Sequence, residues 1–145
     1  MFKGEHVHTL DSKGRLIMPS KFRQDLGDKF VATKGLDRCL FVYPASEWNA
    51  IEKNLRELPF TKGDYRAFTR LFFSGAEDCE FDKQGRFLIP QSLRDYAGID
   101  RDVVAIGVST RVEIWAKAEW EQYQKNNNQR YEELAEKIVD LGNEA

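Results

Sequence analysis

The sequence predicts an α+β fold made of two tandem copies of one unit, related by a pseudo-twofold axis. The segment from Leu10 to Pro19 returns with similar residues from Phe81 to Pro90, 71 positions later. Each copy places Asp-x-x-Gly-Arg between two short apolar runs, and each ends in Pro. Such self-similarity indicates two copies of a supersecondary unit that bury their apolar faces against each other. The 145 residues, 41% of them hydrophobic, suffice for one sizeable core or two small ones and exclude a large multidomain enzyme.

The first elements of each copy are predicted to be two short strands joined by a tight turn. An aspartate opens each turn, where its carboxylate accepts backbone N–H groups. A glycine stands where a hairpin turn needs a positive φ, and an arginine follows it directly. These two signature turns contain Asp11, Gly14 and Arg15 in the first copy and Asp82, Gly85 and Arg86 in the second.

A short helix is predicted after the second strand of each copy. Pro19 separates that strand from the helix, because proline cannot continue a strand ladder or a helix interior. Ser20 is expected to cap a helix over Lys21–Leu26, and Gly27 is expected to end it. Gly98 takes the terminating position in the second copy.

Two further strands and a helix complete each half, so that each half reads β-β-α-β-β-α. The expected strands cover residues 29–34, 39–43, 102–108 and 111–115, and the expected helices cover 46–58, 64–74 with Asp64 as its cap, and 118–141. Asn126, Asn127 and Asn128 are poor helix formers and indicate a bend or a frayed turn in the last of these.

The predicted organisation has three parts, a first half over residues 1–58, a linker and connecting helix over 59–75, and a second half with a C-terminal helical extension over 76–145. A strand-turn-strand unit of this size cannot bury both faces alone. One arrangement that meets this need interleaves the hairpins of the two halves into one small β-barrel with flanking helices. Periodicity alone equally allows two separate half-barrels side by side.

The composition indicates a cytoplasmic protein whose overall electrostatic field is weak. Twenty-two Lys and Arg oppose 24 Asp and Glu, which leaves a net charge of −2 and no global attraction to nucleic acid. Neither a secretion signal nor an apolar run of about 18 residues occurs, so no membrane partner is expected. Cys39 and Cys79 lie apart in apolar surroundings, which favours reduced core thiols over a disulfide or a metal site, and no cofactor is expected.

Both Asp-x-x-x-Arg turns, the adjoining Leu-Ile-Met-Pro and Phe-Leu-Ile-Pro runs and the opening Met-Phe-Lys-Gly-Glu together resemble the MraZ family over nearly the whole chain. The resemblance implies two tandem AbrB-like (SpoVT-AbrB) halves that form a small swapped-hairpin β-barrel, which favours the interleaved arrangement. It further implies a bacterial transcriptional regulator of the division and cell wall gene cluster. It also implies binding to short G-rich direct repeats in double-stranded DNA of the family's own promoter, by a homo-oligomeric ring such as an octamer or dodecamer. A nucleoid-associated location follows from that role.

Local charge favours the first turn as the DNA contact. Residues 1–24 carry a net charge of +3, whereas residues 76–95 carry −2. Arg15 is expected to enter the major groove and bridge O6 and N7 of guanine, with Asp11 orienting it. Phosphate attraction favours the basic window, and the candidate DNA-binding residues are Lys3, Lys13, Arg15, Lys21 and Arg23.

Other interpretations of the same residues stay open. The Asp and Arg of each turn can pair merely to hold the fold together, an interpretation that we favour for Arg86. An AbrB-like chain can also act as an antitoxin-like protein-interaction module, although such a module usually ends in a disordered tail. An enzyme or metal site would depend on His6 and His8 with Glu5 or Asp11, which lacks a third ligand.

Two apolar sets are candidates either for assembly surfaces or for intramolecular core stripes. Both sets have helical spacing. The first comprises Tyr65, Phe68, Leu71, Phe72 and Phe73, and the second comprises Tyr131, Leu134, Ala135, Ile138 and Leu141. The last 30 residues carry a net charge of −3 and are expected to avoid DNA.

Overall fold

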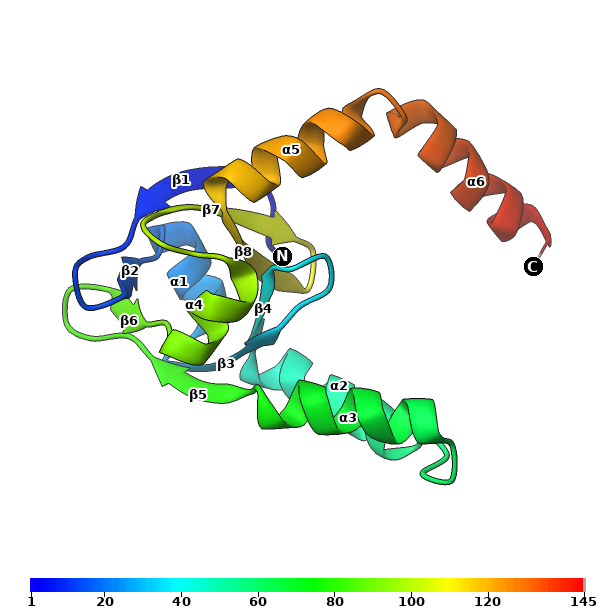
Figure 1. The fold of residues 1–145 in the computed structure, drawn as a ribbon, viewed down its shortest axis with the longest axis horizontal. Coiled ribbons are helices and arrows are strands. Elements are labelled where there is room, and N and C mark those ends of the chain that lie inside the picture. The colour runs from blue at the N-terminus through cyan, green and yellow to red at the C-terminus, as the bar shows by residue number, and fades with distance from the viewer. Residues whose placement is uncertain (145) are drawn as a thin grey trace.

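A computed structural model describes residues 1–144, with side chains to residue 138. The first half contains β1 (Glu5–Thr9), β2 (Arg15–Ile17), α1 (Ser20–Leu26), β3 (Lys29–Lys34), β4 (Leu40–Pro44) and α2 (Ala45–Arg56). The connecting helix α3 (Gly63–Ser74) follows. The second half contains β5 (Glu77–Glu80), β6 (Arg86–Leu88), α4 (Gln91–Ala97), β7 (Asp102–Val108), β8 (Arg111–Ala116) and α5 (Lys117–Asn128), and α6 (Tyr131–Glu144) ends the chain. The α+β class and the repeated element order are as predicted (Figure 1).

The strands of the two halves interleave, and they do not form two separate sheets. The larger sheet is antiparallel with the order β1-β7-β8-β4-β3-β5, and β2 pairs with β6 in a second, two-stranded sheet. Among the described residues, β1 of the first half pairs with β7 of the second, and β5 of the second half pairs with β3 of the first. The two strands that flank each signature turn therefore do not pair with each other as the predicted hairpins would. Each half therefore contributes an outer strand to the other, which decides between the two arrangements that periodicity left open.

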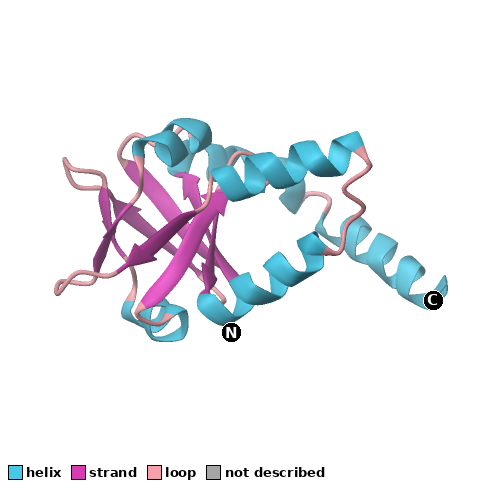
Figure 2. Ribbon diagram, turned by 90° about the horizontal axis from the view of Figure 1, so that it is seen from below, coloured by secondary structure: helices cyan, strands magenta, loops and turns pink. Residues whose placement is uncertain are grey.

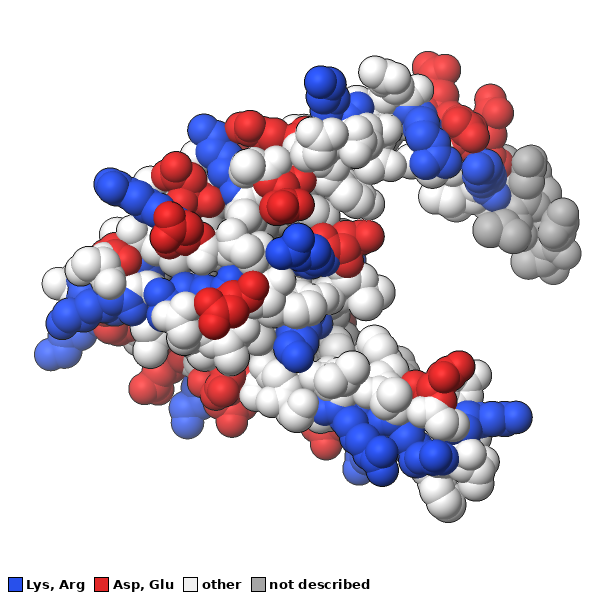
Figure 3. All heavy atoms as spheres, in the orientation of Figure 1, with Lys and Arg blue, Asp and Glu red and all other residues white. Residues whose placement is uncertain are grey.

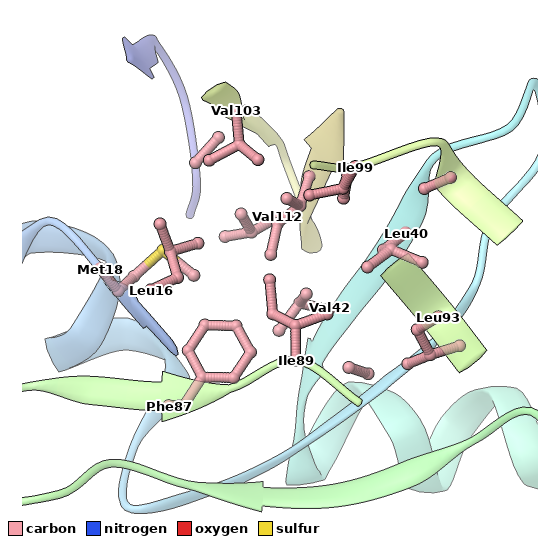
Figure 4. Packing of buried hydrophobic residues seen from close by; sticks show 14 of the residues in the cluster. Leu16, Met18, Leu40, Val42, Phe87, Ile89, Leu93, Ile99, Val103 and Val112 are labelled. Carbon is pink, nitrogen blue, oxygen red and sulfur yellow. The ribbon is translucent and has the colours of Figure 1, made fainter. Parts of the chain in front are cut away.

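One apolar core is shared by the two halves. Leu16 and Met18 from the first half meet Phe87 and Ile89 from the second, and all four are essentially inaccessible to water (Figure 4). Because alternate residues of a strand face opposite sides, Ile17 and Leu88 point away from this core and are about half exposed. The short β2–β6 pair is thereby fixed against the larger sheet by its inward side chains.

A second apolar cluster lies on the other face of the larger sheet, beneath the long helices. It consists of Cys39, Phe41, Tyr43, Phe72, Val104, Ile106 and Trp115. Trp48 of α2 stacks on Phe72 of α3 with ring centroids 5.6 Å apart, and this contact attaches the connecting helix to the first half. Cys39 is fully buried, and Cys79 packs against the shared core, so both thiols have the predicted apolar surroundings.

Two predicted helix caps are wrong. Helix α1 begins at Ser20 itself, with Pro19 as the capping residue, because Arg23 N–H already donates to the Pro19 carbonyl. Helix α3 begins at Gly63, and Asp64 lies inside its first turn, where its negative charge still faces the positive end of the helix dipole. The glycine predictions are confirmed, since Gly27 and Gly98 end α1 and α4 with positive φ.

The predicted single C-terminal helix is two helices. Helix α5 ends at Asn128, the last of the three asparagines that indicated a bend, and α6 begins at Tyr131. The α2–α3 pair and the α5–α6 segment extend as two arms from the end of the sheet that lies opposite the β1–β2 and β5–β6 turns (Figures 1 and 2). Among residues 1–144, no helix has the length and apolar character needed to span a membrane.

The arms leave most of the two apolar sets in contact with water. Phe72 is buried in the second cluster, but Tyr65, Phe68 and Leu71 of the same helix are exposed. Tyr131 and Ile138 on α6 are exposed as well. The core-stripe interpretation therefore holds for Phe72 and fails for these five residues, whereas the side chain of Leu141 lies outside the described residues.

Candidate nucleic-acid interface

The two signature turns lie side by side at one end of the molecule (Figures 1 and 2). Antiparallel pairing places Arg15 opposite Leu88 and Ile17 opposite Arg86. Each turn is also bonded to the residue that follows the short strand of the other repeat, because Met18 N–H donates to the Gly85 carbonyl at 3.3 Å and Ile89 N–H donates to the Gly14 carbonyl at 3.0 Å. The sequence interpretation treated the turns as separate candidates, but they form one composite surface.

Each aspartate organises its own turn as predicted. One oxygen of Asp11 accepts the backbone N–H groups of Lys13 at 3.0 Å and Arg15 at 2.9 Å, and the other accepts Arg15 Nε–H at 2.7 Å. Asp82 binds the backbone and Nε of Arg86 in the same way. The backbone N–H of the arginine is the main cause that lowers the pKa of each aspartate, and the guanidinium adds to it. Both carboxylates are therefore charged at neutral pH.

The two arginines differ in how fully the protein occupies their guanidinium groups. Arg86 donates from Nη2 to Gln84 Oε1 at 2.6 Å, and its Nη1 lies 4.0 Å from the carboxylate of Asp11. In the described part of the chain, Arg15 is bound only through Nε, which leaves its terminal Nη1 and Nη2 groups available. The difference follows from the sequence, since Lys13 stands where the second turn has Gln84 and a lysine cannot accept a hydrogen bond.

Two further arginines pack against the turn glycines, and each belongs to the opposite repeat. The guanidinium of Arg94 on α4 lies against Gly14, and that of Arg23 on α1 lies against Gly85. Arg23 also donates to the Met18 carbonyl at 2.7 Å. Charge alone selected Arg23 as a DNA contact and overlooked Arg94. The signal that could have found both is their equivalent place in the repeat, after Phe22 and Leu93.

The remaining basic candidates are exposed, and positive charge is present at the turn end of the molecule (Figure 3). Lys3 and Lys21 lie outside the turns, whereas Lys13 lies in the first turn. The acidic residues that make the second window negative are mostly on β5, which pairs with β3. The second turn itself carries Lys83 and Arg86 against Asp82, so its local charge equals that of the first.

The histidine and cysteine candidates form no metal centre in the described residues, where no group of three possible ligands occurs. His6 packs edge-on against Phe22 with ring centroids 5.1 Å apart. Burial, with a smaller contribution from His6, lowers the pKa of His8. Burial raises the pKa of Cys79 to about 11, so this thiol is protonated at neutral pH and unsuited to nucleophilic chemistry.

Comparison with known families settles the resemblance. A family model described as "MraZ protein, putative antitoxin-like" matches twice, over residues 1–71 and 72–141. The chain belongs to the MraZ family. The two matches divide the chain inside α3, and they cover the same duplication that the signature turns mark.

Relatives named as MraZ proteins match this chain over nearly its full length. A protein of Pelotomaculum thermopropionicum is 62% identical over 141 residues, which are 97% of each chain. A protein of Moorella thermoacetica is 60% identical over 141 residues, 97% of this chain and 99% of its own, and one of Syntrophomonas wolfei is 59% identical over 142 residues, 98% and 99%. Each is named "Transcriptional regulator MraZ", which describes a regulator and not an enzyme.

Proposed function

We propose that this protein is a sequence-specific DNA-binding regulator of the bacterial division and cell wall gene cluster, which binds short G-rich direct repeats in its own promoter. Membership of the MraZ family and the name of its relatives support the regulatory role. The G-rich target and the gene cluster are what the family resemblance implies. A nucleoid-associated location is part of the same proposal.

The arrangement of Arg15 carries the proposal. Asp11 binds its Nε, so the guanidinium is held at its base while Nη1 and Nη2 are available. A guanidinium presented in this way can bridge O6 and N7 of one guanine, a contact that discriminates against other bases by about 1–3 kcal/mol. A two-stranded β-ribbon fits the major groove. In this chain the ribbon is the β2–β6 pair, and a signature turn precedes each of its two strands.

Phosphate contacts are assigned to the exposed lysines Lys3, Lys13 and Lys21. Each neutralised phosphate releases condensed counterions, so every such contact adds affinity that falls as salt rises. Arg23 was selected with these lysines, but its contact with the second turn favours a supporting role. Binding is assigned mainly to the first turn, because Gln84 and Asp11 already occupy the guanidinium of Arg86.

A homo-oligomeric ring would supply the affinity that one small turn surface lacks. The exposed apolar residues of α3 and α6 provide material for contacts between copies. Once one subunit has bound, the next DNA repeat is met at high effective concentration, and linked sites gain a factor of about 100 to 10,000 without new contacts. Ring size sets how many turn surfaces face DNA.

The direct test is a salt-dependent binding assay with the DNA upstream of the protein's own gene. Arg15→Ala should reduce specific affinity by about 5- to 150-fold, and Arg86→Ala should change it little. Affinity of the wild type should fall steeply between low and physiological salt. Unchanged affinity of Arg15→Ala, with its thermal unfolding unaltered, would refute the assignment of Arg15.

A protein-interaction role is the second candidate, favoured by the antitoxin-like description of the matched family. In that case a partner polypeptide would contact the turn surface or the arms. Co-purification of a second polypeptide at a fixed ratio, together with absence of DNA binding by the wild type, would favour it over the first proposal.

A further inference from the structure

The space above each turn glycine is filled by an arginine from the other repeat. A Cβ atom built on Gly14 would lie 2.5 Å from both Cζ and Nη1 of Arg94, and one built on Gly85 would lie 2.5 Å from Nη1 and 2.8 Å from Cζ of Arg23. Gly14 and Gly85 also have φ of +82° and +76°. The positive φ therefore favours glycine at both positions, and the guanidinium that packs on each glycine occupies the space that a side chain there would enter.

We propose that Arg94 is a positioning residue for the first turn and Arg23 for the second, so that each turn is held in its DNA-reading shape by the helix of the opposite repeat. This inference rests on the proposed function for its consequence, but the positioning itself can be measured without DNA. It predicts that a substitution in the second repeat impairs the turn of the first.

A short series of contacts connects Arg94 to Arg15. Arg94 covers Gly14, and Gly14 N–H closes the turn by donating to the Asp11 carbonyl at 3.0 Å. The carboxylate of Asp11 then binds both the backbone N–H and the Nε of Arg15. Removing the guanidinium of Arg94 opens space over Gly14, so the backbone of the turn can adopt more conformations. Because Gly14 is bonded to Asp11 and Asp11 to Arg15, the position of the Arg15 guanidinium becomes less well defined.

The two supporting arginines are not equally bonded, and this makes Arg94 the better residue to test. Arg23 donates to the Met18 carbonyl and thereby anchors β2 as well. Nε of Arg94 is buried with no acceptor among the described residues, so the contact with Gly14 is one of shape. Truncating Arg94 removes an unsatisfied buried donor, and the fold should therefore tolerate it.

Hydrogen exchange measured by mass spectrometry on the intact protein tests the crossed arrangement. Arg94→Ala should accelerate exchange about five- to tenfold in peptides that cover residues 11–17, with peptides that cover 82–88 unchanged. Arg23→Ala should accelerate the second turn, together with β2. Arg70→Ala, on the exposed surface of α3, removes the same charge far from the turns and should alter neither.

Arg94→Lys separates shape from charge. Lysine keeps the positive charge but lacks the planar group that covers Gly14, so it should exchange like Arg94→Ala. Wild-type protection in Arg94→Lys would overturn the proposal, and so would equal acceleration of both turns, or of neither, in Arg94→Ala.

A DNA-binding measurement on the same variants distinguishes this inference from the proposed function. In promoter DNA binding, Arg94→Ala should cost about tenfold in the wild type and little in an Arg15→Ala background, because both act through one turn. Equal losses in the two backgrounds would overturn a route through Arg15. Failure of the wild type to bind DNA would refute the proposed function, while crossed exchange effects would still establish the positioning role.

Discussion

Phe87→Ala tests whether the two repeats form one cooperative unit. Phe87 belongs to the second repeat and is 2% exposed. It packs edge-on against Phe30 of the first repeat, with ring centroids 5.2 Å apart, and against Phe81 at 5.9 Å. Truncating a buried phenylalanine to alanine costs about 3–5 kcal/mol, a large share of the roughly 5–15 kcal/mol that stabilises a domain. We expect Tm to fall by about 6–20 °C.

The measurement is thermal unfolding by circular dichroism, combined with hydrogen exchange of β3–β4 and β7–β8. Because the core is shared, both repeats should lose protection to the same extent in a single transition. Leu88→Ala, on the same strand but 54% exposed, should shift Tm little. If Phe87→Ala fails to fold, Phe87→Leu provides the same test with a smaller loss of stability, because leucine keeps most of the side-chain volume. Two separate transitions, or a first repeat that keeps full protection, would refute the shared core.

Three further outcomes are expected. The pKa of Asp11 and Asp82 is lowered from 3.8 in the folded protein, so the carboxylates stabilise the turns fully above that pH, and this stabilisation is lost as pH falls through the lowered pKa values. Hydrogen exchange of the turns, corrected for intrinsic rates, should show this loss of protection at low pH. Asp11→Asn should abolish the pH dependence in the first turn. Removing Gln84 should free the guanidinium of Arg86 for DNA, so Arg86→Ala should weaken DNA binding in a Gln84→Ala background and hardly at all in the wild type. An equal loss of affinity in the two backgrounds would contradict the role of Gln84. Deleting one promoter repeat should weaken binding far more than proportionally in a titration, and a proportional loss would exclude avidity.

The sequence alone predicts the local structure of the turns because their causes are local. Asp11 and Gly14 lie three residues apart, and the hydrogen bonds and positive φ that they provide arise within the turn itself. Local sequence does not predict which strands pair, because the pairing of β1 with β7 depends on packing between the two halves. Periodicity therefore left two topologies open, and only the family resemblance favoured the interleaved one.

The helix ends and the supporting arginines show where local reasoning fails. Ser20 is a good capping residue, but Pro19 already fills that position with a fixed φ and a free carbonyl. The repeat makes Arg94 the equivalent of Arg23, but its contact with Gly14 exists only after the halves interleave, so the sequence alone does not give its role. Charge summed over a sequence window likewise mixed the acidic residues of β5 with the turn that follows them.

The pairing of Glu5 with Ile106 sets an order on folding during synthesis. When β1 leaves the ribosome, β7, the strand with which it pairs, has not yet been translated. The apolar residues of β2, β3 and β4 therefore remain exposed to water until β7 and β8 have been synthesised and can pack against them. Folds dominated by such distant pairings form slowly and expose surfaces that aggregate. Nascent chains stalled before β7 should consequently be protease-sensitive and bound by chaperones.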